Sequence, residues 1–299
     1  MANTRDIKKR IKAVGNIKRI TRTMQMIATS KFSRASGRAT ATKPYTEGVF
    51  DLVTELAATA GNISHPLIDG PADGPADDAK ELTLLITSDR GLCGPYNGSI
   101  LRLAQGHLRD NPDAKDGRID LVGKKGAAFL KFNGIPVAEH HTVGDTPTFE
   151  QIEHIAQQYM DLFTAGKITG VRVIYMRFIS AGKQVPTIMN LLPLKPPAVD
   201  ETAEASGPNS SGPNLEYEFS PAAGELLNDL LPSTVKASLF QAFNDAIVSE
   251  HVARMVAMKA ATDNAGKMRK DLTRVYNRAR QAQITTELTE IISGAAALE

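Results

Sequence analysis

A stretch without helix breakers occupies the C-terminal part of the chain. From Ser233 to Glu299 there is no proline, and Gly266 and Gly294 are the only glycines. A helix of roughly sixty residues would be about 90 Å long, which is too long for one globular domain to bury. The stretch is therefore predicted to be a coiled-coil helix that needs a partner along its length, and a long core helix of a bundle is the alternative. Its expected seam repeats in steps of three and four residues: Met258, Ala261, Ala265, Met268, Leu272, Val275, Ala279 and Ala282.

Residues 3–60 show the pattern of a second long helix. Asn3 or Thr4 can cap its start, and Asp6 lies near the positive end of the helix. Pro44 is expected to kink this helix or to end its first part. Because the two helices lie at opposite ends of the sequence, the simplest arrangement pairs them antiparallel. The apolar stripe expected to face the partner consists of Ile7, Ile11, Val14, Ile17, Ile20, Met24 and Ile27.

Charge is unevenly distributed along the chain. Residues 1–40 carry eleven lysines and arginines but only one acidic residue, Asp6, so their net charge is +10 in a chain of net charge +2. Such an asymmetry is typical of an interaction surface. The basic start could also be read as a mitochondrial transit peptide. We favour a structural helix, because the pattern continues well past Lys31.

Two segments rich in proline, glycine and polar residues are predicted linkers that contain neither helix nor strand. The expected division is an N-terminal helix over 1–63, a linker over 64–80, an α/β domain over 81–193, a linker over 194–219 and a C-terminal helix over 220–299. Within the last part, Ser220 and Pro221 are expected to start a short helix that Pro232 ends, with the long helix beginning at Ser233.

Strand and helix patterns alternate between the two linkers. Such alternation predicts an α/β domain with a mostly parallel sheet, although the last two strands are close enough in sequence to be antiparallel. Strands are expected at 82–87, 119–122, 171–179 and 185–192, an extended segment at 135–141, and helices at 96–109, 124–132 and 149–163.

Motifs for catalysis are weak in this domain. Residues 88–94 follow a strand and precede a helix, where phosphate loops occur, but the GxxxxGK[ST] pattern is absent and Pro95 removes an amide. Residues 123–126, GKKG, lack the serine or threonine that would hold magnesium. Cys93 is the single cysteine, so no internal disulfide can form and a reducing compartment is expected. We interpret it as a packed thiol, with a catalytic nucleophile as the alternative.

Neither a metal site nor nucleic-acid binding is expected. His140 and His141 are consecutive and should point to opposite faces of a strand, so with Glu139 they are not expected to converge on one metal ion. The other histidines show no ligand spacing. The chain has no tryptophan, and no aromatic residues are interleaved with the basic ones, which argues against a nucleic-acid-binding coiled coil. No cofactor is expected either.

Four segments resemble the gamma subunit family of rotary ATP synthases. Residues 250–297, which include MVAMKAATDNAGKM, are similar to the C-terminal signature of that family, and residues 5–31 are similar to its N-terminal helix. The run TSDRGLCG at 87–94 resembles its central motif, and QVPTIMNLLPL at 184–194 also matches. The resemblance covers nearly the whole chain. It implies an α/β fold with a long antiparallel coiled coil of N- and C-terminal helices and an inserted Rossmann-like domain.

The resemblance also implies a function. A gamma subunit is a central stalk without bond chemistry of its own, and its rotation couples proton translocation to ATP synthesis or hydrolysis. The implied partners are the alpha and beta subunits, the epsilon subunit and the membrane ring of c subunits, at the cytoplasmic face of the cell membrane. The chloroplast relatives carry a regulatory dithiol, which a chain with Cys93 alone cannot form.

Candidate coupling residues follow from the same resemblance. Met24, Arg254, Arg280 and Gln281 lie at positions that match coupling residues of the family, although plain coiled-coil packing is an equal alternative for Met24. The other candidates are Arg278 among the C-terminal bases, Ile291 and Ile292 in the uncharged tip, and Asp89 and Arg90 in the central motif. A Rossmann-type enzyme with helical appendages is the alternative function, and it predicts nucleotide binding or turnover by the isolated chain.

Overall fold

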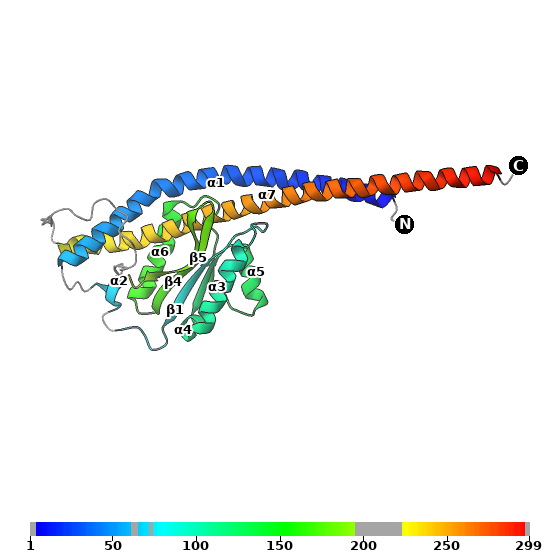
Figure 1. Ribbon diagram of the computed structural model, residues 1–299. Helices are drawn as coiled ribbons and strands as arrows, with labels where there is room; N and C mark the ends of the chain where they lie inside the picture. Colours follow the sequence, from blue (N-terminus) through cyan, green and yellow to red (C-terminus); the bar gives the residue numbers. More distant parts are fainter. Residues whose placement is uncertain (1–3, 61–64, 72–73, 195–222, 297–299) are drawn as a thin grey trace. The chain divides into compact units, whose positions relative to one another are not determined.

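The computed structural model describes residues 4–60, 65–71, 74–194 and 223–296. Two long helices begin and end the chain, and the strands lie between them in the sequence (Figure 1). The elements in chain order are α1 (Thr4–Ala60), α2 (Pro66–Asp69), β1 (Lys80–Ile86), α3 (Tyr96–Asp110), α4 (Pro112–Lys115), β2 (Arg118–Val122), α5 (Lys124–Phe132), β3 (Glu139–His141), α6 (Phe149–Thr164), β4 (Ile168–Ser180), β5 (Lys183–Leu192) and α7 (Ala223–Ala296).

The chain divides into two compact units, and both long helices contribute to each. The shaft unit comprises Met1–Lys31, Leu92–Gly94 and His251–Glu299. The sheet unit comprises Phe32–Gly91 and Pro95–Glu250. This division by compactness falls inside α1 and α7, whereas the division expected from the sequence falls at the ends of the helices and remains a proposal.

A five-stranded sheet in the order β3-β2-β1-β4-β5 organises the sheet unit. β1 pairs in parallel with β2 and with β4, β2 pairs in parallel with β3, and β4 pairs antiparallel with β5. The expectation of a mostly parallel sheet with an antiparallel final pair is therefore confirmed. The continuous apolar run of β1 follows from its position, because a central parallel strand is covered on both faces.

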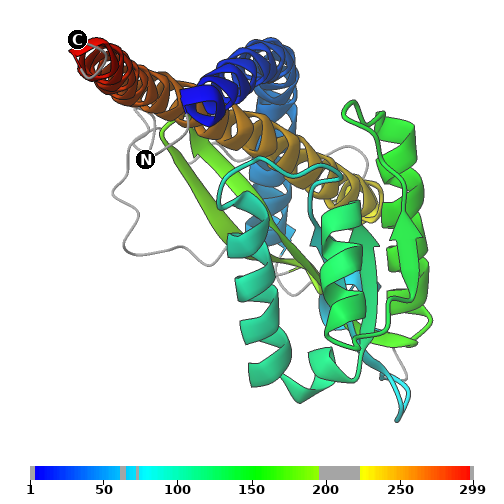
Figure 2. The same ribbon diagram turned by 90° about the vertical axis from the view of Figure 1, so that its right-hand side faces the viewer.

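Helices cover both faces of this sheet. Leu82, Leu84 and Ile86 of β1 belong to a buried cluster that also contains Ile152, Ala156, Tyr159 and Phe163 of α6 and Leu239 and Phe243 of α7. The right-handed connections of parallel strands place α3 and α5 on the other face, and α6 lies apart from them across the strands (Figure 2). The sheet unit thus has the three layers of a Rossmann-like domain, with residues 223–250 of α7 as part of one layer.

The start of α6 shows how local sequence fixes one of these helices. The Thr148 hydroxyl accepts the Gln151 N–H, and the Gln151 side chain accepts the Thr148 N–H, which together form a capping box. Ile152, Ile155 and Ala156 then follow on the buried face. The predicted helix over 149–163 is confirmed.

One expectation about proline was wrong, because Pro232 lies inside α7, which continues through it to Ala296. Pro44 lies inside α1, so it does not end this helix, and the alternative of a kink at Pro44 stays a prediction. Pro44 and Thr40 are both exposed, so water can solvate the Thr40 carbonyl that has lost its helical N–H partner. Leu231 and Val235 on either side of Pro232 are buried in the core, and their packing holds the helix together there. Ser220 and Pro221 lie outside the described residues.

The predicted linker over 64–80 was also partly wrong. It contains the short helix α2, because Pro66 can begin a helix and the His65 side chain accepts the Leu67 N–H at 3.1 Å. Burial lowers the pKa of His65, and the charge of Asp69 opposes this shift. The segment also overlaps β1, which begins at Lys80. The linker over 194–219 lies outside the described residues apart from Leu194.

Candidate subunit interface

The shaft unit is an antiparallel pair of helices with a seam of mostly small and polar residues. The Thr262 and Thr21 hydroxyls lie 2.8 Å apart, and the Thr4 hydroxyl donates to Gln283 Oε1 at 3.1 Å. These two contacts establish that α1 and α7 run in opposite directions here. In the shaft unit, the buried or half-buried positions of α1 include Thr4, Ile7, Ile11, Val14, Gly15, Lys18, Thr21, Gln25 and Ala28, and those of α7 include Met258, Thr262, Ala265, Leu272, Tyr276 and Ala279.

About half of the expected seam was wrong. In α1, Ile17, Ile20, Met24 and Ile27 are exposed, and the position that follows each of them faces the partner helix instead. In α7, Met268, Val275 and Ala282 are also exposed, while the other expected residues lie on the seam: Met258, Ala261, Ala265, Leu272 and Ala279. Two heptad rows one residue apart have the same period, and periodicity alone cannot choose between them. Small residues such as Ala28 and Ala265 allow the two backbones to approach closely, which turns the larger neighbours outward.

Large apolar side chains therefore cover the outside of the shaft unit. Exposed apolar side chains in such number are typical of a surface that binds another protein. Ile20 of α1 is 55% exposed and Met268 of α7 is 56% exposed, although both belong to residue types that usually lie in cores. The other members of this outer apolar surface are Ile17, Met24, Met26, Ile27, Val256, Val275, Ile284, Leu288, Ile291 and Ile292.

A basic groove accompanies the outer apolar surface. It has a volume of about 1030 Å³, and its walls come from the first part of α1 together with Arg269 of α7. Eight bases and no acidic residue line it: Arg5, Lys8, Lys9, Lys12, Lys18, Arg19, Arg22 and Arg269. A concave surface with one sign of charge attracts acidic partners and speeds their association.

The candidate coupling residues do not form one cluster. Met24 lies on α1 and is 37% exposed, and Arg254 is half-buried on α7. Arg280 is 26 residues further along α7 than Arg254, or about 40 Å at the rise of an α-helix. Arg278, Gln281, Ile291 and Ile292 are exposed near the C-terminal end of α7, and Asp89 and Arg90 are exposed in the sheet unit. Within the shaft unit these residues are spread along the helices, which suits an extended interface.

The central motif forms a turn whose glycines and thiol have structural roles. Leu92 has φ 63°, which is unusual for a residue with a side chain, and Gly94 has φ 57°. A Cβ on Gly94 would lie 3.6 Å from the Ala257 Cβ in the shaft unit. Cys93 is 2% exposed, in agreement with the interpretation of a packed thiol.

A crevice at the carboxyl edge of the sheet is too small for a ligand. Ligands of such sheets bind beyond the carboxyl ends of the strands. The crevice beyond the ends of β1 and β2 holds only about 30 Å³, and Phe243 and Ala246 of α7 form part of its lining. The Tyr96 hydroxyl donates to the Ala246 carbonyl at 3.1 Å. A nucleotide needs a pocket of roughly 300 Å³ or more, so none fits here.

In the second glycine motif, GKKG, a side chain of the protein takes the position where a phosphate would bind. Asp89 Oδ1 accepts the Lys124 N–H at the first turn of α5, where a phosphate would bind. Gly123 has φ 95°, and a Cβ there would lie 2.2 Å from the Thr87 carbonyl oxygen. This motif is therefore a tight turn against β1.

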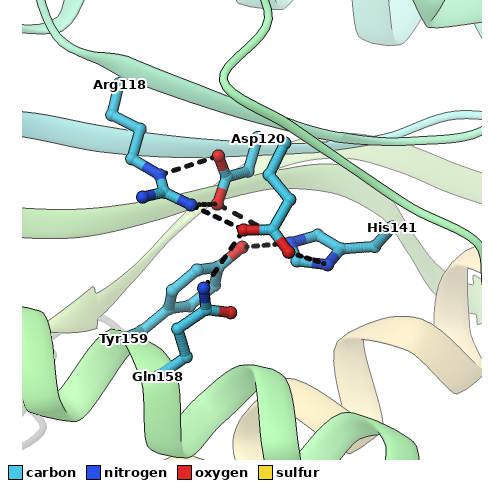
Figure 3. A network of polar contacts seen from close by, with 6 residues as sticks. Arg118, Asp120, His141, Gln158 and Tyr159 are labelled. Atoms are coloured by element: carbon cyan, nitrogen blue, oxygen red, sulfur yellow. Dashed lines mark hydrogen bonds and ion pairs between the residues drawn. The ribbon is translucent and has the colours of Figure 1, made fainter.

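A polar network at the β2–β3 edge of the sheet was not expected. Arg118 donates to both oxygens of Asp120, at 2.9 and 3.2 Å, and to Glu139 Oε2 at 2.7 Å. His141 points into the same network (Figure 3). His140 points to the opposite face of β3, as expected, but Glu139 and His141 share a face and lie together, which was not expected. The overlooked signal was the i, i+2 spacing, together with Arg118 and Asp120 at the same spacing on β2.

Burial and charge shift the acidity of two groups in this network. Burial opposes ionisation of Asp120, but polar contacts with His141 and Arg118 outweigh it and hold the pKa of the carboxyl below its ordinary value. Burial, reinforced by the charge of Asp120, raises the pKa of Tyr159 well above its ordinary value. Asp120 therefore remains an anion inside the fold, and Tyr159 remains a neutral hydroxyl.

The fold and the outer surface of the helices define a class: a coiled-coil shaft with an inserted Rossmann-like domain. A family model described as ATP synthase matches residues 3–298. The ATP synthase gamma chain of Rhodopirellula baltica is 42% identical, and that of Desulfitobacterium hafniense is 38% identical, each with 100% of both chains covered. The chain belongs to the ATP synthase gamma-chain family.

Solved structures share the fold. A chain of the Euglena gracilis mitochondrial ATP synthase, in a structure of OSCP, F1 and c-ring in rotational state 3, matches with a TM-score of 0.66 at 19% identity. That match covers 99% of this chain and 94% of the other. A second structure of the same enzyme, described as the rotor in rotational state 1, matches with a TM-score of 0.64 at 18% identity over 94% of this chain and 98% of the other.

Proposed function

We propose that this chain is the rotating central stalk of a proton-translocating ATP synthase and couples rotation to ATP synthesis and hydrolysis. The observation that carries the proposal is the outer apolar surface of the shaft unit. A seam of small residues leaves Ile20, Met268 and their neighbours exposed. A shaft that turns inside a protein sleeve needs such a surface, because apolar contacts have no direction and do not hold the shaft at one angle.

The proposed partners are those of the gamma-chain family. The sleeve would consist of alternating alpha and beta subunits, and the epsilon subunit and the membrane ring of c subunits would hold the other end. One of the similar Euglena structures is an assembly of OSCP, F1 and c-ring, which supports this assignment. The basic groove is suited to acidic segments of the sleeve, and Met24, Arg254, Arg278, Arg280, Gln281, Ile291, Ile292, Asp89 and Arg90 are the proposed contact residues.

The chain is proposed to lack a catalytic site of its own. The supporting observation is that the crevice beyond the carboxyl ends of β1 and β2 holds only about 30 Å³, which is too small for a nucleotide. None of the helices in the described ranges is both long and apolar enough to cross a bilayer. We infer a peripheral position at the cytoplasmic face of the cell membrane, where the stalk would meet the c-ring.

Coupling requires that the shaft presents different faces to different catalytic sites. A symmetric shaft would bias all sites equally, and its rotation would change no affinity. In the shaft unit one side carries the basic groove of α1, and α7 continues toward an uncharged tip. Each orientation would therefore favour a different nucleotide affinity at a given beta subunit, and rotation would order binding and release.

Co-expression with the cognate alpha and beta subunits tests the proposal. We expect one copy of this chain to co-elute with each alpha–beta assembly, and ATP hydrolysis to depend on its presence. The isolated chain should neither bind nor hydrolyse ATP. Failure to associate, or ATPase activity of the isolated chain, would contradict the proposal and favour the Rossmann-type enzyme.

A further inference from the structure

The polar network at the β2–β3 edge contains three groups that are common metal ligands. Asp120 of β2 lies opposite Glu139 of β3 in the parallel register, and His141 follows Glu139 on the same face. One donor atom from each of these residues can be chosen so that all three lie within 4.8 Å of one another. Gln158 and Tyr159 of α6 approach from the adjacent layer (Figure 3).

The Glu139 carboxylate is held through one of its two oxygens. Oε2 accepts from Arg118 Nη2 at 2.7 Å and from Gln158 Nε2 at 3.1 Å. Oε1 is thereby directed toward His141 Nδ1, at 3.5 Å. In the described part of the chain Oε1 has no hydrogen bond of its own.

The His141 imidazole is likewise held through one of its two polar atoms, Nε2. Its side chain is 8% exposed, and Nε2 lies 3.2 Å from the Tyr159 hydroxyl and 3.6 Å from Asp120 Oδ2. Nδ1 faces Glu139 Oε1 and makes no hydrogen bond with any described residue. The ring is thus positioned through Nε2, and Nδ1 is directed toward Glu139.

The gap between these two atoms suits a bound cation better than a hydrogen bond. Protein N–H···O bonds are typically about 2.7–3.2 Å long, so 3.5 Å is too long for a good one. An ion with ligand bonds of about 2.0–2.2 Å in tetrahedral geometry separates neighbouring ligands by about 3.4 Å. Both donors are also fixed in place beforehand, which lowers the entropy cost of binding.

We propose that Glu139 Oε1 and His141 Nδ1 bind a divalent transition-metal ion of the Zn²⁺ class at the β2–β3 edge. A mixed imidazole and carboxylate set favours Zn²⁺ over Mg²⁺ or Ca²⁺, which take oxygen ligands. Tyr159 and Asp120 act as orienting groups on Nε2, as carboxylates commonly do for metal-bound histidines. Arg118 neutralises one of the two carboxylate charges, so the site keeps one net negative charge with a neutral imidazole.

Exposure determines how the ion enters. The Glu139 side chain is 39% exposed while His141 is nearly buried, so the ion reaches Nδ1 from the side of Glu139 and keeps water as its remaining ligands. β3 has only three residues and is the outermost strand of the sheet. A bound ion would link Glu139 and His141, the first and last residues of β3. Because Asp120 of β2 contacts His141, fixing this ring would also strengthen the attachment of β3 to β2.

Zinc titration of the purified full-length chain tests this site. The chain, free of affinity tag and metal, is titrated with Zn²⁺ against a chromophoric chelator, and the His141 ring nitrogens are followed by ¹⁵N NMR. We expect one equivalent to bind with a shift at Nδ1, and Glu139→Gln and His141→Gln each to weaken binding by at least about tenfold. Zn²⁺ should also raise the melting temperature of the wild-type chain and not that of either variant.

His140→Gln is the matched control, because His140 neighbours the site but is exposed on the opposite face of β3. It should bind Zn²⁺ as the wild type does. The proposal is overturned if the wild type leaves the His141 ring nitrogens unshifted at Zn²⁺ saturation, or if Glu139→Gln binds as tightly as the wild type. Glu139→Gln keeps the size of the partly exposed side chain, so an unfolded variant does not obscure the result.

Discussion

Asp245 is a buried carboxyl group, and its burial disfavours the ionised form. It is 9% exposed on α7 and accepts from Gln241 Nε2 at 2.9 Å. Burial raises the pKa of this carboxyl, and hydrogen bonds from Gln241 and the Phe178 N–H offset only part of that effect. Burial, reinforced by the charge of Asp245, raises the pKa of Tyr175 to about 12, so this hydroxyl stays neutral.

The sign of the pH effect follows from the raised pKa of Asp245. A carboxyl whose pKa is higher in the folded state stabilises the fold fully below its unfolded pKa of about 3.9, and this contribution is lost as the pH rises through the folded value. Asp245→Asn should therefore become more stable relative to the wild type as the pH rises above about 4. Urea unfolding across this range measures the difference, and Asp263→Asn, at an exposed position, serves as the control. A difference that does not change with pH would contradict the assignment.

Arg280 tests the proposed coupling contacts. It is exposed on α7, so Arg280→Glu should change the free energy of unfolding of the isolated chain by no more than about 0.5 kcal/mol. In the assembled enzyme the reversed charge should repel acidic partners and lower proton-driven ATP synthesis. Circular dichroism of the chain and ATP synthesis in membrane vesicles provide the two measurements. Unchanged synthesis with normal assembly would remove Arg280 from the interface.

At the scale of elements, the two sides of α7 should respond differently to substitution. Ala265 is 7% exposed on the seam, and Ala265→Leu should lower the free energy of unfolding by about 1–3 kcal/mol through overpacking. Met268 is 56% exposed, and Met268→Ala should be nearly neutral in the isolated chain but reduce ATP-dependent coupling in the complex. Thermal unfolding and coupled ATPase assays distinguish the two. If both variants destabilised the isolated chain equally, Met268 would lie on the seam, as periodicity predicts, and not on the outer surface.

Most elements could be predicted from the sequence, because each depends on local signals. The β1 run, the Thr148 capping box and the long stretch without helix breakers from Ser233 all correspond to observed elements. The continuation of α7 through Pro232 could not be predicted, since buried neighbours outweigh the local effect of proline. The outward turn of Ile20 and Met268 was missed because it depends on how closely two distant helices approach.

The candidate sites were predictable to different degrees. The basic character of residues 1–40 is visible in composition, and the basic groove lies on the same helix. The network of Asp120, Glu139 and His141 was missed, because it depends on the parallel register of β2 and β3. Only the pairing of β2 with β3 brings these groups together.

At the scale of the whole molecule, charge and surface support one interpretation. The first 40 residues carry a net charge of +10 while the chain carries +2 in all, so the basic surface is concentrated on one helix. That helix and α7 also expose large apolar residues in the shaft unit. A protein that works alone has no use for either surface, whereas a shaft enclosed by other subunits needs both.

Direct observation of rotation tests the central claim. Lys115, the exposed last residue of α4, is replaced by cysteine in a Cys93→Ser background, and a bead is attached to it in a complex with immobilised alpha and beta subunits. We expect the bead to turn in one direction when ATP is supplied and to stop when ATP is removed. Hydrolysis of ATP by the complex while the bead remains stationary would contradict the account.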